Sequence, residues 1–463
     1  MRGILIIILF VSILPRAVSQ EVLNLSLEDC INYALENNEQ LSIAKMENEI
    51  AVTQINETLA RGLPQVDGNI GVTKNFRIQT SFIQDFISPA VYGVLINESL
   101  LPNGTDVPEP QTFPAAFGTE YSGIAGISAR QLIFDGSFFV GLQAARTVKL
   151  LSERQQKQTE VEVVENVSKA YYLVLIAKEN LEFVGRNFST IDTLYRETQA
   201  MYDAGFAEKI DVSRLKIQHN NLRTSLKNNT ELLITSLNLL KFQMGMSIDQ
   251  RISLTGNLTD VDLAMVEGSD GEQYLNRPEY GVLQTNKDLI ALNIKNFKSQ
   301  YIPNIYANFN FGWTSGTNSF GDLTNFDNTT WFKYSNLGVS IGIPIFDGFS
   351  KRANIQRNKV QMRQVEASIS QFKNNVSREV QEATINVENA RRNVETQEEN
   401  VELAKEVYTM TKVKYQEGVG SNLEVVEANT SLKEAQTNYL NALYEAITSQ
   451  IELKKALGTL YKN

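Results

Sequence analysis

The sequence predicts an α+β membrane protein that combines four short β-strands with two pairs of very long α-helices. Short segments in which apolar and polar residues alternate are typical of strands between lipid and an aqueous interior. Long stretches that lack proline and nearly all glycine are typical of continuous helices. The same order of elements occurs twice along the 463 residues, which predicts two internal structural repeats.

The two predicted repeats span residues 20–276 and 277–463. The matching pairs are the segments from Asn38 and Arg277, the IFDG motifs that end at Gly136 and Gly348, the turns from Tyr202 and Tyr415, and the dipeptides at Met244 and Leu457. The spacing between matching positions changes once, between the strands. A single deletion in a loop of the second copy explains that change, because loops tolerate deletions.

Each predicted repeat contributes two strands and two long helices. The strands are expected at about residues 65–76, 121–133, 304–313 and 334–345. The long helices are expected at about residues 138–203, 207–244, 349–417 and 421–457. A helix of about 65 residues is about 100 Å long, which is more than a globular domain of this size needs. These helices are therefore predicted to form a coiled coil or the wall of a tunnel.

The predicted strands have one apolar face and one polar face. In the fourth strand, Leu337, Val339 and Ile341 alternate with polar residues or glycine, and Ile343 and Ile345 continue the pattern. This alternation predicts a membrane β-barrel, with aromatic side chains near its outer rim: Phe311, Trp313, Tyr121 and Tyr334. A soluble β-sandwich has the same period and is the alternative.

The N-terminus has the features of a secretory signal peptide at residues 1–19. Arg2 is followed by an apolar segment of about 11 residues, which is too short to cross a bilayer. The net charge of −10 and the pI near 5.0 argue against a nucleic-acid partner, because such proteins need basic patches.

The chain lacks the residues that most catalytic and metal sites require. Cys30 is the only cysteine and His219 is the only histidine. Cys30 is predicted to be a buried core residue, with acylation or reactivity as the alternative, and His219 to be structural or solvated. We therefore expect no catalytic set, no metal site and no cofactor, so that the protein is not an enzyme.

Four strands cannot close a barrel, and a bilayer does not tolerate an open sheet edge. Several copies of the chain must therefore pool their strands. Two copies would give eight strands, whose side chains fill the interior, whereas three give twelve strands and room for a channel. The residues favour a trimer and leave a dimer open.

The ordered motifs resemble those of the TolC-type outer-membrane efflux proteins. The similar features are the two-copy layout, the LPQV, IPNI and IFDG motifs, the YxxGxxxxx[DE]V turns and the closing segment SQIELKKALGTL, over about residues 24–461. The resemblance implies a homotrimer whose twelve-stranded outer-membrane barrel is continued by a long periplasmic α-helical coiled-coil tunnel. It also implies the passive channel of a tripartite efflux or type I secretion system, with a periplasmic adaptor (membrane fusion) protein and an inner-membrane pump as partners. The absence of a cysteine at the predicted cleavage site sets this chain apart from lipid-anchored members.

The resemblance assigns roles to the two helical turns and to nearby acidic residues. The turns are helix connections in any case, and the resemblance implies that they also dock to the adaptor: Ala204, Gly205, Phe206, Glu417, Gly418 and Val419. Glu424 and Glu427 match acids that ring the closed aperture, and Asp211 is the counterpart of Glu424 in the first repeat. Ser421 and Glu424 also fit a capping box, so Glu424 could be only a cap.

The predicted gate departs from the family at one position. Tyr415 matches a tyrosine that helps to hold the turns closed, whereas Gly420 stands where the family has a basic residue. Lys209 and Arg214 are the candidate substitutes.

Residues 77–120 and 314–333 are predicted to be extracellular loops.

Two other classes of protein remain as alternatives. A trimeric autotransporter-like adhesin also pools four strands per chain, but it places them in one C-terminal block. A periplasmic coiled-coil structural protein would leave the alternating strands unexplained.

Overall fold

The computed structural model describes residues 22–258, 272–325 and 331–461, so the predicted signal peptide lies outside the described residues. The chain forms two compact units. The sheet unit comprises residues 53–145 and 291–359, and the helical unit comprises the described residues up to 52, 146–290 and 360–461. Several long helices contribute residues to both units.

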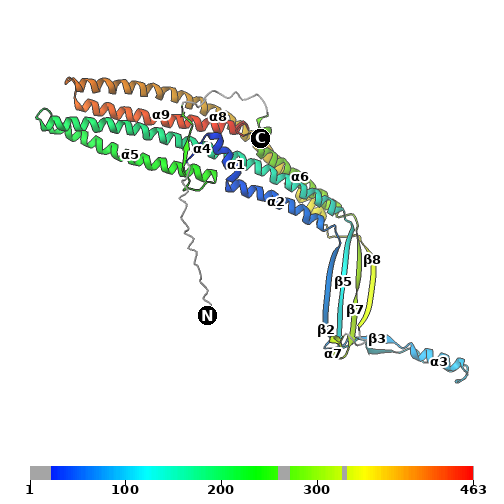
Figure 1. Ribbon diagram of the computed structural model, residues 1–463. Helices are drawn as coiled ribbons and strands as arrows, with labels where there is room; N and C mark the ends of the chain where they lie inside the picture. The colour runs from blue at the N-terminus through cyan, green and yellow to red at the C-terminus, as the bar shows by residue number, and fades with distance from the viewer. Residues whose placement is uncertain (1–21, 259–271, 326–330, 462–463) are drawn as a thin grey trace, which may run out of the picture. The chain divides into compact units, whose positions relative to one another are not determined.

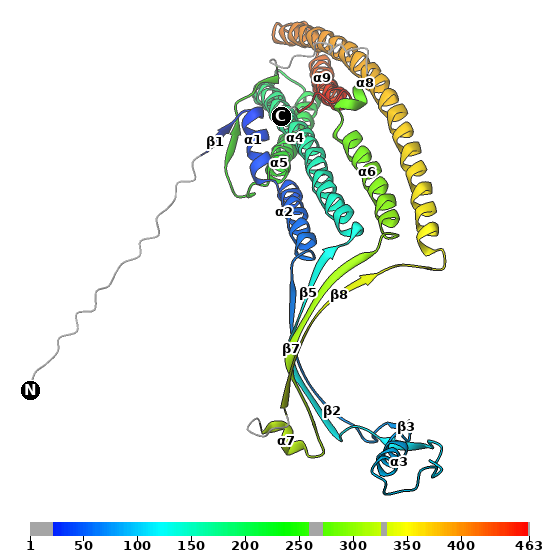
Figure 2. The ribbon, with the colours of Figure 1, turned by 90° about the vertical axis from the view of Figure 1, so that its right-hand side faces the viewer.

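The sheet unit contains one antiparallel four-stranded sheet in the order β2-β5-β7-β8, shown in Figures 1 and 2. Its strands are β2 (Gln65–Lys74), β5 (Tyr121–Phe134), β7 (Asn304–Thr317) and β8 (Trp331–Gly342). The edge strands β2 and β8 each pair on one side only among the described strands. The sheet therefore has two open edges.

The last two strands differ from their predicted bounds. β7 continues beyond residue 313 because Thr314 and Ser315 pair with Phe332 and Trp331. The same pairing makes β8 begin before residue 334. β8 ends at Gly342 rather than 345, because Pro344 has no N–H group to donate to the ladder.

The strand register separates a polar face of the sheet from an apolar face. On the polar face, amide and hydroxyl side chains bond across neighbouring strands: Asn69 Nδ2 to Ser128 Oγ at 3.2 Å, Asn310 Nδ2 to Asn336 Oδ1 at 2.8 Å, and Asn308 Nδ2 to Ser340 Oγ at 3.1 Å. The opposite face exposes large apolar side chains, such as Ile70 and Leu337. The first face therefore suits contact with water, and the second suits an apolar environment.

The predicted aromatic rim needs one correction. Phe311 and Trp313 lie on the apolar face with their ring centroids 5.2 Å apart. Tyr334 instead pairs with Gly312 and lies on the polar face, where its hydroxyl covers Gly126. Tyr334 stands two residues before Asn336 in β8. Successive side chains of a strand point to opposite faces, so these two lie on the same, polar face.

The two segments predicted as loops contain regular elements. The first holds a hairpin of β3 (Thr80–Gln84) and β4 (Thr112–Ala116), with the apolar helix α3 (Ile87–Asn97) between its strands. The second holds the short helix α7 (Phe320–Thr324). Short paired segments such as TSFIQ and TFPAA carry too few residues to show a period, so the sequence did not indicate them.

The helical unit is a bundle of long helices. Its main helices are α4 (Gly136–Asp203), α5 (Lys209–Met244), α8 (Ser350–Gln416) and α9 (Asn422–Ala456). The shorter elements are β1 (Leu23–Leu25), α1 (Leu27–Asn37), α2 (Glu39–Ala60), β6 (Ile252–Leu254), the 3-10 helix η2 (Gln273–Asn276) and α6 (Pro278–Ser299), and β1 pairs with β6 in parallel. None of the described helices has an apolar stretch long enough to cross a lipid bilayer.

Apolar side chains from both halves of the chain share one core. Ile176 of α4, Val394 of α8 and Ile447 of α9 are buried in one cluster.

A second cluster contains Cys30 and Leu240. Burial of the Cys30 thiol raises its pKa to about 12, so Cys30 is a packed core residue.

Ion pairs add specific links between α4 and α9. The Glu165 carboxylate accepts bonds from Lys169 at 2.9 Å and from Lys455 at 2.7 Å, and Lys169 also reaches Glu452 at 2.8 Å. Burial alone would raise the pKa of Glu165, but the two lysines outweigh it and the pKa is lowered. Glu165 is therefore a charged group that holds the two helices together.

A glycine stands at the C-terminal end of α5 and another at that of α9, and each lies close to a part of the chain that is distant in sequence. Gly245 and Gly458 have φ of +70° and +68°, as glycines that end helices often do. A Cβ atom at Gly245 would overlap the backbone of Asn37, and one at Gly458 would overlap Asn276. Matching positions in the two halves thus make the same close approach.

We expect Gly245→Ala to lower the thermal unfolding midpoint of the mature protein in detergent, measured by near-ultraviolet circular dichroism. The left-handed conformation alone costs about 1–2 kcal/mol for a residue with a Cβ atom. Gly205→Ala is the matched control, because Gly205 has φ of +86° and open space around it. A larger drop for Gly245→Ala isolates the overlap with Asn37, and equal drops would contradict it.

Candidate functional site

The candidate site lies at the turns of the two long helical hairpins (Figure 1). In the first turn, the Phe206 N–H donates to the Met201 carbonyl at 2.7 Å and the Gly205 N–H donates to the Tyr202 carbonyl at 2.9 Å. This pair of bonds defines a Schellman motif, which requires a left-handed residue at Gly205.

The second turn repeats this geometry. The Val419 N–H donates to the Lys414 carbonyl at 3.0 Å, and the Gly418 N–H donates to the Tyr415 carbonyl at 3.1 Å. Gly418 has φ of +77°. The two helical hairpins therefore present equivalent turns.

All six predicted turn residues are exposed: Ala204, Gly205, Phe206, Glu417, Gly418 and Val419. The apolar side chains of Phe206 and Val419 are 85% and 79% exposed. The Schellman motif often buries an apolar side chain at this position, but here both point to solvent. The turns therefore offer apolar surface to another molecule.

The acidic residues next to the turns differ in their surroundings. Glu424 and Glu427 lie one turn apart on the exposed side of α9. Ser421 Oγ accepts a bond from the Glu424 N–H at 3.2 Å, which is half of the predicted capping box. The other half would be a bond from the Ser421 N–H to the Glu424 carboxylate, and the described part of the chain does not contain it. The Glu424 carboxylate is thus left exposed to solvent.

Asp211 lies in the first turn of α5 and is half-buried. The Arg214 guanidinium approaches its carboxylate at 3.9 Å, which is a distance for charge attraction but too long for a hydrogen bond. Arg214 is therefore the basic residue that the structure places beside Asp211. Lys209 is exposed and belongs to the same turn.

Polar side chains fill the contact between α5 and α9 near the turns. Asn422 Nδ2 donates to the Asp211 carbonyl at 3.3 Å, and Gln218 Nε2 donates to Asn429 Oδ1 at 3.5 Å. Asn422 Oδ1 and Asn429 Nδ2 are buried and have no hydrogen-bond partner among the described residues. A buried polar atom without a partner typically costs about 1–3 kcal/mol, so this contact is weak for its degree of burial.

Tyr415 joins α8 to α4. Its hydroxyl lies 2.9 Å from Thr198 Oγ1, and Thr198 is fully buried. The ring packs against an apolar cluster that includes Leu194 and Val425. Thr198 did not stand out in the sequence, although its spacing from Ile191 and Leu194 continues one helical face.

Gly420 has a steric role in the second turn. Its N–H donates to the Lys414 carbonyl at 3.0 Å. A Cβ atom there would lie 3.0 Å from both Lys414 Cβ and Tyr415 N, tighter than ordinary packing. A side chain at this position would require Lys414 or the backbone at Tyr415 to shift, so glycine suits the compact turn.

His219 contacts an acidic side chain and an aromatic ring. His219 Nε2 lies 3.1 Å from Asp192 Oδ1, and its ring stacks on Tyr195 at 5.5 Å. Across residues 22–258, 272–325 and 331–461, no group of three or more His, Cys, Asp or Glu side chains could hold a metal ion. The structure accounts for His219 as a packing residue between α4 and α5.

Comparison of the sequence with known proteins gives consistent matches. Residues 30–246 and 275–459 match the profile of the outer membrane efflux protein family. The probable efflux pump outer membrane protein TtgC of Pseudomonas putida is 23% identical over 273 residues, which are 59% of this chain and 54% of TtgC. Outer membrane protein TolC of Vibrio cholerae is 22% identical over 394 residues, which are 80% of this chain and 79% of that protein. The match thus spans about half the length of TtgC.

Solved structures show the same fold. The Campylobacter jejuni CmeC outer membrane channel superposes with a TM-score of 0.70 at 17% identity, covering 94% of this chain and 86% of CmeC. The Neisseria gonorrhoeae MtrE outer membrane channel in its open state gives a TM-score of 0.69 at 18% identity, covering 94% and 89%. Together with the family match, these results show that the chain belongs to the outer membrane efflux protein family, whose members lie in the outer membrane and extend into the periplasm.

Proposed function

We propose that the protein is the outer-membrane component of a tripartite efflux or type I secretion system. It acts as a passive conduit from the periplasm to the exterior and is gated at its periplasmic tip. The observation that carries this proposal is the four-stranded sheet, which has one apolar face, one polar face and two open edges. A lipid-facing and water-lining wall needs the two faces, and it also needs further strands at both edges.

The open edges support a homotrimer. Three copies would join β8 of one chain to β2 of the next and close a twelve-stranded barrel. The helices also present apolar stripes that a neighbouring copy would cover. On α8, Leu403, Val407 and Met410 share one face and are 53%, 55% and 52% exposed.

The helical part supports a tunnel wall built from two repeats. α4 and α5 have 68 and 36 residues, and α8 and α9 have 67 and 35. Both helical hairpins have the same turn motif. Each also ends at a glycine, Gly245 or Gly458, that lies close to a distant part of the chain. In a trimer, these helices would form a twelve-helix periplasmic wall.

The exposed apolar turns support docking of a periplasmic adaptor protein. Phe206 and Val419 are the side chains that such a partner would cover. An inner-membrane pump would supply the energy, because the described chain has no nucleotide-binding loop. The names of TtgC, an efflux pump outer membrane protein, and of CmeC, an outer membrane channel, agree with this role.

The alternative classes do not explain the structure. In an autotransporter-like adhesin, the strands would form one C-terminal block, whereas here α4 and α5 lie between the two strand pairs in sequence and α9 follows them. A periplasmic coiled-coil structural protein has no use for a sheet with an exposed apolar face.

The gate is proposed to combine an acidic constriction with a separable helix contact. Three copies of Glu424 and Glu427 near a common axis would attract cations, and Asp211 would lie close to them. The poorly satisfied contact between α5 and α9 would allow the turns to move apart. The bond between Tyr415 and Thr198 would hold the closed arrangement.

The assembly is testable by disulfide formation between copies. In a Cys30→Ser background, Val66→Cys on β2 is combined in turn with Leu337→Cys, Val339→Cys or Ile341→Cys on β8. We expect at least one pair to give a covalent trimer on a non-reducing gel, because strand edges of neighbouring copies must pair. Single-cysteine variants are the controls. Failure of all three pairs, with a monomer in mild detergent, would contradict the trimer.

We expect the double variant Glu424→Gln, Glu427→Gln to reduce cation selectivity in planar bilayers and to relieve block by a trivalent cation added from the periplasmic side. Coulomb attraction grows with ligand charge, so the trivalent ion is the most sensitive probe. Glu434→Gln is the matched control, since Glu434 is also exposed on α9. Unchanged selectivity and block would show that both carboxylates face away from the pore.

A double-mutant cycle tests the proposed latch. Tyr415→Phe and Thr198→Val should each speed amide hydrogen exchange around Gly205 and Gly418, with a coupling of about 1 kcal/mol. Tyr444→Phe is the control, since the Tyr444 hydroxyl has no hydrogen bond to the described residues. Strictly additive effects would mean that the 2.9 Å contact does not hold the turns.

A further inference from the structure

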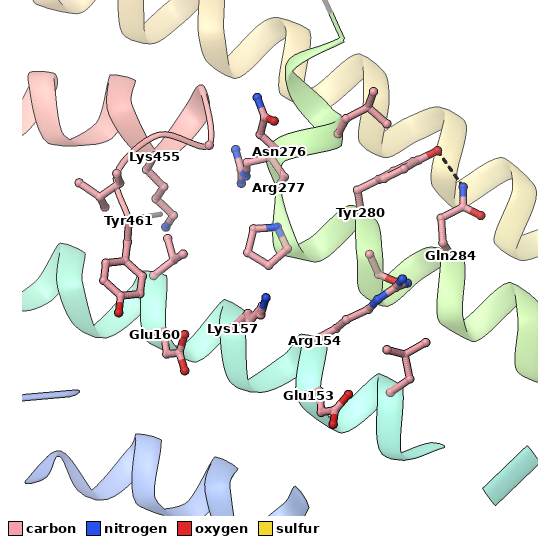
Figure 3. A pocket seen from close by; sticks show the side chains of 17 residues that line it. Glu153, Arg154, Lys157, Glu160, Asn276, Arg277, Tyr280, Gln284, Lys455 and Tyr461 are labelled. Carbon is pink, nitrogen blue, oxygen red and sulfur yellow. Dashed lines mark hydrogen bonds between the residues drawn. The ribbon is translucent and has the colours of Figure 1, made fainter. Parts of the chain in front are cut away.

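The helical unit contains a cavity of about 520 Å³ that none of the roles above uses. Three segments line it: α4 around Arg154, the end of η2 with the start of α6, and the end of α9 with the residues after it. Figure 3 shows Arg154 and Lys157 extending from α4 toward α6. The volume is in the range of small-molecule sites in proteins.

Two of the basic residues at this cavity are already neutralised. Arg277 bonds to Glu279 at 2.8 Å and to Glu379 at 3.1 Å, and Lys455 bonds to Glu165 at 2.7 Å. These cations have fixed carboxylate partners within the protein. They therefore build the wall rather than attract a ligand.

Arg154 and Lys157 differ from these residues. Arg154 Nη1 donates to the Gly281 carbonyl and to Thr285 Oγ1, each at 2.5 Å, and Thr285 is fully buried. Both acceptors are neutral. Within the described ranges, neither Arg154 nor Lys157 forms an ion pair with a carboxylate. Arg154 and Lys157 are thus the cations of the lining that have no carboxylate within salt-bridge distance among the described residues.

The position of Arg154 is fixed in advance. A Cβ atom at Gly281 would lie 3.2 Å from Arg154 Cδ, so the glycine leaves room for this side chain against α6. Glycine inside a helix typically costs about 0.5–1 kcal/mol relative to alanine. Its presence here lets the Arg154 side chain lie against α6, where Nη1 bonds to Gly281 and Thr285.

One acidic residue of the lining has a cation partner of its own, and the other lies away from Arg154. Glu153 is paired with Lys149 at 2.7 Å. Glu160 accepts a bond from Gln156 at 2.8 Å, and Figure 3 places it near Tyr461 at the other end of the cavity from Arg154. An anionic group is therefore favoured at the end that holds Arg154.

The rest of the lining is largely apolar. Figure 3 shows the ring of Tyr280 on α6 on the same side of the cavity as Arg154, and Leu150 and Pro278 also line the cavity. The Tyr280 hydroxyl accepts a bond from Gln284 Nε2 at 2.8 Å, so its ring is held in place. A ligand with an aromatic or aliphatic body would fit this surface.

We propose that this cavity binds a small organic monocarboxylate. Its carboxylate lies between Arg154 and Lys157, and its apolar body lies against Tyr280 and Leu150. The ligand bridges α4 from the first half of the chain to α6 from the second half. Binding therefore stabilises the folded bundle by mass action.

The test uses hydrocinnamate as the probe and the full mature protein in detergent. Calorimetric titration should show saturable binding, and the thermal unfolding midpoint should rise with probe concentration. The neutral isostere hydrocinnamamide should bind at least about tenfold more weakly, because it has no negative charge to attract the two cations. Equal binding of the amide would overturn the proposal.

Variants distinguish this site from non-specific binding. Lys157→Gln and Arg154→Gln should each weaken hydrocinnamate binding by about tenfold. Lys157 is exposed, so its replacement leaves folding intact even if Arg154→Gln does not. Lys178→Gln is the matched control, an exposed lysine on α4 outside this cavity. Wild-type affinity in the Lys157 variant would contradict the proposal.

A diazirine analogue of hydrocinnamate locates the bound molecule. After irradiation and digestion, the label should map to peptides that contain Arg154, Tyr280 or Tyr461. Labelling confined to the sheet unit would show partition into an apolar surface and would reject the cavity. Because bilayer conductance is not part of this test, its result is independent of the proposed export function.

Discussion

Unpaired backbone groups at the two edges of the four-stranded sheet are the constraint on which the architecture depends. β2 and β8 each have one row of N–H and C=O groups with no partner among the described strands. Hydrocarbon offers no hydrogen bonds, so a sheet with an apolar outer face is stable in a bilayer only when those rows are paired. Closure of the sheet by further copies of the chain follows from this requirement, and the trimer is the proposed form of that closure.

The helical bundle is tight at its base and looser near its turns. At the base, Gly245 and Gly458 abut the backbone so closely that no side chain fits, and Glu165 holds charged partners on α9. Near the turns, Asn422 and Asn429 keep buried polar atoms without partners. A helix pair with this gradient separates most easily at the turns, which is where a gate is proposed.

The Tyr415 region combines a packing role with the proposed latch. The ring contributes to an apolar cluster from four helices, while the hydroxyl satisfies the buried Thr198. Breaking this contact exposes apolar surface and leaves a buried hydroxyl unpaired, so both terms oppose opening. Gly420 supports the same arrangement, because its lack of a side chain lets the second turn close over Lys414.

The sequence by itself determined the four strands of the main sheet and the order of the long helices, because those signals are local. Absence of proline, a glycine at each turn and strict alternation act on neighbouring residues, so α4 and α8 were predicted to within a few residues. Family membership followed from the order of the motifs. The strand ends and the face of Tyr334 depended on the register with neighbouring strands. Only the tertiary structure could bring Tyr415 to Thr198, or Arg154 to Thr285, because each pair is more than a hundred residues apart in sequence. Such pairs carry no periodic signal, since their meeting depends on how whole helices pack.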